Sequence, residues 1–137
     1  MKAVAIELAA LGDTDPLWRA WLDDAGRRFR VDVTSLDEQL PNWRQLLQRF
    51  AEERAPVYFR RDAEVTAALR RLHDRGARMA VFTAVPEELA RIALEHLGGA
   101  QRVEALEAGP GAQERALARL GGAATVVRTR DELIAVT

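Results

Sequence analysis

Carboxylates lie near the end of the first apolar run of this chain and shortly after it, and they could take part in metal or acid–base chemistry. Glu7 lies near the end of the run from Lys2 to Leu8, and Asp13 and Asp15 follow in an Asp-Thr-Asp pattern. An Asp-x-Asp pair could bind Mg²⁺, because hard cations prefer oxygen ligands. The alternative is a loop in which Asp15 caps a helix that begins at Pro16. We favour the loop, because the pair lies too far beyond the end of the apolar run.

Thr83 is the polar residue at the carboxyl end of a second apolar run, residues 77–83. It is followed by Ala84, Val85 and Pro86, which precede a helical pattern. Free backbone amides at such a helix start can bind an anion, and open α/β sheets place their ligands at strand ends of this kind. A purely structural role, with Thr83 capping the helix, is equally compatible with the sequence.

Other kinds of catalytic group are scarce. The chain has no cysteine, which excludes thiol catalysis, disulfides and cysteine zinc sites. Lys2 is the only lysine among 20 basic residues, a bias typical of GC-rich bacterial genomes. Neither His73 nor His96 has the neighbouring ligands that a metal site needs. We therefore expect no metal and no cofactor.

The absence of cysteine fits a reducing cytoplasm, where we expect the protein to be. The net charge of −1 does not favour nucleic acid or an anionic membrane as a partner. The apolar start of the chain, residues 1–12, is short and is better explained as a buried strand than as a signal peptide. No apolar run approaches the length needed to span a membrane.

The elements that would position these groups alternate along the chain. Apolar runs predict strands at 2–8, 77–83, 102–106 and 125–128, and helical spacing predicts helices at 16–29, from 41 onward, at 62–75, 86–97 and 111–120, and from 129. Alternation of this kind predicts a three-layer α/β fold, with a parallel sheet of about four strands covered on both faces. Residues 14–60 are too long for a plain crossover and are predicted to form a helical insert.

Three tryptophans lie in this insert, at positions 18, 21 and 43. They could line a pocket or a partner surface, but their helical spacing favours packing between the insert helices. The arginine clusters at 27–30 and 60–61 are interpreted as solvated surface. A carboxylate such as Glu7, at the end of a buried strand, must reach solvent or pair with an arginine, for which the insert is one source.

Four segments resemble a known family. They are KAVAIEL at 2–8, YFRRDAEVTAALRRLHDRGARMAVFTAVPEELARIALEHLG at 58–98, ALARLGG at 116–122 and TVVRTRDELIAV at 125–136. Together with the helical insert, they are similar to capped phosphatases of the haloacid-dehalogenase-like (HAD) superfamily whose lid follows the first strand. This resemblance implies a Rossmann-like core at 1–13 and 61–137, a cap at 14–60, and the strand order 4-1-2-3.

The resemblance also implies a phosphoryl-transfer site, which depends on positioning and charge neutralisation. The nucleophile position falls on Glu7, the acid/base position on Ala9, the phosphate-binding position on Thr83 and the lysine position on Glu107, with Pro110 retained from the lysine motif. The late acidic motif that holds Mg²⁺ has no counterpart, because only residues 121–124 separate the last long helix from the final strand. Of these positions only Thr83 matches, so we expect Mg²⁺ binding to be lost.

Three functions remain open at this point. The favoured hypothesis is a non-catalytic HAD-like protein (a pseudoenzyme) that acts as a regulatory or protein-interaction module, as a homodimer through an exposed sheet edge. A second is a binder of a small phosphorylated ligand at Thr83. A third is a phosphatase-type hydrolase with an altered mechanism that uses Glu7 or Asp13.

Overall fold

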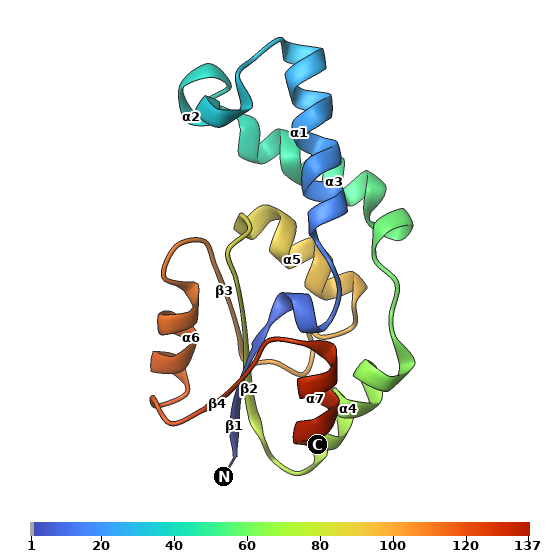
Figure 1. Cartoon of the computed structure of the whole chain (residues 1–137), viewed down its shortest axis with the longest axis vertical. Helices are drawn as coiled ribbons and strands as arrows, with labels where there is room; N and C mark the ends of the chain where they lie inside the picture. Colours follow the sequence, from blue (N-terminus) through green and yellow to red (C-terminus); the bar gives the residue numbers. More distant parts are fainter. Residues whose placement is uncertain (1) are drawn as a thin grey trace.

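A parallel sheet of four strands forms the centre of the molecule (Figure 1). The computed structural model describes residues 2–137, so Met1, which the predicted core includes, lies outside the described residues. The strands are β1 (Ala3–Glu7), β2 (Arg78–Thr83), β3 (Ala105–Ala108) and β4 (Thr125–Val127). Their order is β3-β2-β1-β4, and every neighbouring pair is parallel. The predicted strand number and strand order are confirmed.

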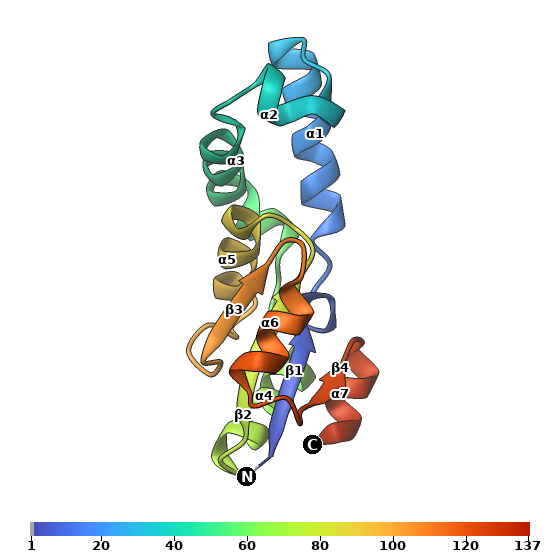
Figure 2. The ribbon, with the colours of Figure 1, turned by 90° about the vertical axis from the view of Figure 1, so that its left-hand side faces the viewer.

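Helices cover both faces of the sheet, as the alternating pattern predicts. On one face, Val4, Ile6 and Val81 belong to the larger apolar core, together with residues of α4 (Ala63–Asp74), α5 (Glu87–His96) and α7 (Arg130–Val136). On the other face, Ala5, Ala80 and Phe82 pack with α6 (Ala112–Arg119), which lies in front of the sheet in Figure 2. Alternate residues of β1 and β2 thus enter opposite cores, as the two-residue period of a strand requires.

The segment between β1 and α4 is helical. It contains the short 3-10 helix η1 (Leu8–Ala10), α1 (Asp15–Phe29), the 3-10 helix η2 (Val33–Ser35), α2 (Leu36–Gln39) and α3 (Trp43–Tyr58). Figure 1 shows α1, α2 and α3 beyond the carboxyl ends of the strands. α3 packs against α5, and Arg44 of α3 is 3.0 Å from Glu88 of α5. The cap boundaries 14 and 60 stay a prediction.

The three tryptophans of this segment pack against one another. The ring centroids of Trp18 and Trp21 are 5.7 Å apart, and those of Trp21 and Trp43 are 5.9 Å apart. Trp21 and Trp43 are buried, and the indole N–H of Trp43 donates to Asp37 at 2.8 Å. The favoured interpretation, packing between the helices, agrees with these contacts.

Most helix ends obey the signals in the sequence. The carboxylate of Asp62 caps α4 by accepting from the backbone amides of Glu64 and Val65. Gly76 follows α4 with φ of +77°, and Thr129 caps α7 by accepting from the amide of Glu132. Asp15 differs from its predicted role. It is the first residue of α1 and not its cap, and its amide donates to Asp13 Oδ1 at 3.0 Å.

The third strand and the stretch from 33 to 39 also differ from expectation. The strand predicted at 102–106 lies at Ala105–Ala108, because the ladder with β2 pairs Ala80 with Ala105 and Thr83 with Ala108. The residues from 33 to 39 form η2 and α2, which no helical pattern in the sequence predicted. Within the described chain, no helix is long and apolar enough to cross a membrane.

Candidate functional site

A shallow hollow of about 300 Å³ lies at the carboxyl ends of the strands. Because all four strands are parallel, residues that close β1, β2 and β4 meet there, and the loop after β3 borders them. The residues that line the hollow are Glu7, Phe82, Thr83, Ala84, Gly109, Pro110, Gly111, Ala112, Gln113, Glu114 and Arg128. This is the edge at which open α/β sheets bind their ligands, so we take the hollow as the candidate functional site.

Glu7 is paired with an arginine at this edge. Arg128, the first residue after β4, donates from one terminal nitrogen to Glu7 Oε2 at 3.0 Å. The other terminal nitrogen of Arg128 donates to Gln113 Oε1 at 2.6 Å, and its guanidinium carbon lies 5.7 Å from the centroid of the Phe82 ring. The arginine that pairs with Glu7 therefore directly follows β4 and does not come from the insert.

Thr83 lies at the same edge and is only 8% exposed. Its hydroxyl oxygen accepts from the amide of Val85 at 3.3 Å, which makes a local turn after β2. The helix α5 begins at Glu87, directly after Pro86, and no side chain caps it. Thr83 therefore does not cap α5, and its position beside the hollow is compatible with the anion-binding interpretation.

Glu107 faces away from the hollow. It lies on β3, 18% exposed, with Oε1 2.9 Å from Arg115 and Oε2 3.7 Å from Arg119, both on α6. Arg115 also donates to the carbonyl oxygens of Ala108 and Pro110, each at 2.6 Å. Glu107 thus takes part in attaching α6 and its preceding loop to β3, while Pro110 borders the hollow.

The turn after β1 offers no second carboxylate to the hollow. Ala9 lies in η1 and is exposed, whereas Leu8 and Ala10 on either side are buried. Leu11 is also buried, and its Cδ1 lies 3.3 Å from the point where a side chain at Gly99 would begin, so it packs toward that glycine and does not line the hollow. The hollow is therefore filled neither by Leu11 nor by the tryptophans.

The Asp-Thr-Asp segment is engaged in local structure. Asp13 accepts from the amide of Asp15, and Asp15 pairs with Arg19 one turn along α1. Neither aspartate lines the hollow. Within residues 2–137, no group of three His, Cys, Asp or Glu side chains is arranged to hold a metal ion.

Sequence reasoning did not single out Arg128 or Gln113. A signal for Arg128 was nonetheless present, since it ends the last predicted strand (125–128) of a parallel sheet and so had to lie at the same edge as Glu7 and Thr83. Gln113 offered no such signal, because its place depends on how α6 is rotated over the sheet.

Comparison with known proteins adds one informative likeness. A solved structure from Thermotoga maritima, provisionally described as a beta-phosphoglucomutase, matches 99% of this chain and 81% of its own, with a TM-score of 0.59 and 21% sequence identity. The chain has a HAD-like fold. At this identity the likeness supports the fold and not an activity. No protein-family model and no curated protein matches the sequence.

Proposed function

We propose that this HAD-like protein does not transfer phosphoryl groups and acts as a regulatory or protein-interaction module. The observation that carries the proposal is the ion pair between Glu7 and Arg128, at the position that the HAD resemblance gives to the nucleophile. A carboxylate whose charge is shared with a guanidinium is a weaker nucleophile than a free one. Phosphoryl transfer depends on positioning and charge neutralisation at phosphorus, and here the arginine is engaged by the carboxylate itself.

The neighbouring positions support the same proposal. Ala9 cannot transfer a proton, a role usually worth about 10²–10⁴ in rate. The position that the resemblance gives to a lysine is occupied by Glu107, which contacts Arg115 and Arg119 of α6. This position therefore supplies no cation to the hollow. We propose on these grounds that the protein needs no Mg²⁺ and no other cofactor. We also propose that it works in the cytoplasm, since a chain without cysteine fits a reducing compartment.

A second candidate is a binder of a small phosphorylated ligand. It is favoured by the open hollow, where Thr83 and Arg128 both border the space that a ligand would enter. Binding would need no nucleophile and no acid, so the losses at positions 7 and 9 would not count against it. Isothermal titration with a panel of sugar phosphates tests this candidate, and absence of heat across the panel contradicts it.

An aryl-phosphate assay with Mg²⁺ tests the principal proposal. We expect no turnover above that of buffer for the wild-type protein. Turnover that disappears in Glu7→Gln but persists in Glu114→Gln would instead establish the third hypothesis, a hydrolase that uses Glu7. Glu114 is the matched control because it borders the same hollow and has the same charge.

For the interaction role, we propose a homodimer formed through a sheet edge. In the described part of the chain, β3 and β4 are the two edge strands, and unpaired edges invite strand pairing. Light scattering over a wide concentration range should give twice the mass of the chain. A monomer at high concentration contradicts this part of the proposal and leaves the proposals about catalysis intact.

A further inference from the structure

Arg128 is a cation at the border of the hollow, and the anion that it contacts there is a side chain of the protein itself, Glu7. Its guanidinium donates to the Glu7 carboxylate and the Gln113 amide oxygen, and it lies over Phe82. The side chain of Arg128 is 51% exposed and that of Glu7 is 35% exposed. The pair therefore faces solvent, and partly exposed pairs of this kind are weak enough to be exchanged.

The hollow also holds a donor that is not engaged. Thr83 accepts from the amide of Val85, and no hydrogen bond donated by its hydroxyl is found among residues 2–137. A hydroxyl can donate one hydrogen while it accepts from another group. Thr83 and Arg128 thus offer a neutral and a charged donor to the same space.

The Glu7 carboxylate opposes the binding of an external anion to Arg128 in the hollow. Of the residues that line the hollow, Glu7 and Glu114 are acidic and Arg128 is basic, so the local charge is unfavourable for phosphate. Among the described residues, however, only Glu7 of these two carboxylates contacts Arg128. The two carboxylates can therefore be distinguished experimentally, because one occupies the arginine and the other only adds charge.

We propose that the Glu7 carboxylate occupies an anion site formed by Arg128 and Thr83, and that a phosphate-type oxyanion binds Arg128 when Glu7 is displaced or neutralised. This inference deepens the second candidate function and rests on it. It assigns Glu7 the role of an internal competitor at the position where a phosphatase would carry its nucleophile. It assigns the recognition of the anion to Arg128, whose fork of N–H donors suits phosphate oxygens.

Titration calorimetry with inorganic phosphate tests this inference on four forms of the full chain. Compared with wild type, Glu7→Gln should bind phosphate at least about tenfold more tightly, the lower range of what a charge-assisted hydrogen bond contributes. Glu114→Gln, which removes the same charge without freeing Arg128, should change the affinity less than about threefold. The double variant Glu7→Gln with Arg128→Gln should lose the gain.

The outcomes separate cleanly. Equal gains in phosphate affinity in Glu7→Gln and Glu114→Gln would show a general electrostatic effect and overturn the inference. The inference is also overturned if Glu7→Gln unfolds like wild type on heating and yet shows no gain in phosphate affinity. If Glu7→Gln unfolds, Glu7→Ala is titrated in its place with the same criteria. Hydrolysis of an aryl phosphate by wild type would contradict the proposed lack of catalysis, but it would not by itself produce or abolish the difference between the two variants.

Discussion

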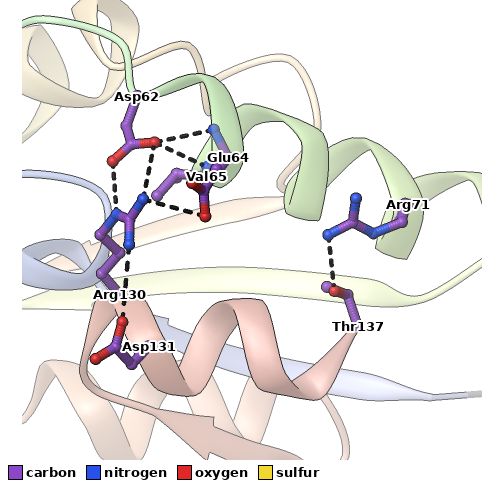
Figure 3. A network of polar contacts seen from close by, with 7 residues as sticks. All are labelled: Asp62, Glu64, Val65, Arg71, Arg130, Asp131 and Thr137. Atoms are coloured by element: carbon purple, nitrogen blue, oxygen red, sulfur yellow. Dashed lines mark hydrogen bonds and ion pairs between the residues drawn. The ribbon is translucent and has the colours of Figure 1, made fainter.

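Arg130 and Asp62 connect the amino ends of two helices that are far apart in the sequence. The Nε of Arg130 donates to Asp62 Oδ2 at 2.6 Å, while Oδ1 of the same carboxylate accepts from the amides of Glu64 and Val65 (Figure 3). One carboxylate therefore caps α4 and holds α7 beside it. At the other end of α7, Arg71 donates to the hydroxyl of Thr137 at 3.1 Å.

This double role predicts a graded loss of stability. Asp62→Ala removes both the cap and the ion pair, and loss of the cap alone should cost about 1 kcal/mol of unfolding free energy. Asp62→Asn should be less destabilising, because its side-chain oxygen can still cap α4. Urea unfolding monitored by circular dichroism measures both. Equal destabilisation by the two variants would show that the ion pair, and not the cap, is the main contribution.

The same contact predicts a pH dependence. The hydrogen bond from Arg130 is the largest cause that lowers the pKa of Asp62 below its ordinary value. A lowered pKa in the folded state means that the stabilisation is complete above the unfolded pKa, about 3.9, and is lost as the pH falls through the folded pKa. The difference in unfolding free energy between wild type and Asp62→Asn should therefore shrink below about pH 4. A difference that is constant from neutral to strongly acid pH contradicts this assignment.

The tryptophan cluster predicts a large effect in the helical segment. Trp21 is 2% exposed and contacts the rings of both Trp18 and Trp43. Trp21→Ala should cost about 3–5 kcal/mol, as for other large aromatic truncations in cores, and it should change the near-ultraviolet dichroism. Trp18→Ala, at a half-buried position, should cost distinctly less. Thermal unfolding compares the two, and similar costs would show that the deeper burial of Trp21 is not the main source of its contribution.

The contacts of Glu107 predict that replacing it with lysine, the residue expected in the HAD pattern, destabilises the folded protein. Glu107→Lys would place an ammonium group beside the guanidinium groups of Arg115 and Arg119. Loss of the charge-assisted hydrogen bond from Arg115, with repulsion added, should cost about 2 kcal/mol. Glu107→Gln, which keeps an acceptor, is the control and should cost less. Unfolding in urea reports the costs, and a neutral or stabilising lysine would contradict the assigned role.

Particular residues show why the fold was more predictable than the site. Val4, Ile6 and the run from 77 to 83 carry a local apolar pattern, so the strands and the parallel order followed from sequence pattern and resemblance. The third strand was misplaced by two to three residues, because the residues of β3 are only partly buried, and Glu104 just before it and Glu107 within it leave no clear alternation.

The side-chain partners were harder, because each joins residues that are distant in the chain. The pairing of Glu7 with Arg128 requires β1 and β4 to be neighbours with Ile6 opposite Val127. The direction of Glu107 depends on the phase of the short strand β3, and the contact between Asp62 and Arg130 depends on how α7 packs against α4. No local pattern encodes these relations, so sequence reasoning gave the positions of Glu7, Thr83 and Glu107 but not their contacts.

The central position of β1 has a consequence for how the chain folds during synthesis. β1 leaves the ribosome before both of its partner strands, which begin at Arg78 and Thr125. Its apolar residues, Val4 and Ile6 among them, therefore stay without a ladder until β2 has been made about 70 residues later, and β4 can join only after β2 and β3. Sheets closed by such distant pairings fold slowly and expose strand edges meanwhile. The nascent chain should therefore depend on chaperones most strongly before β2 emerges.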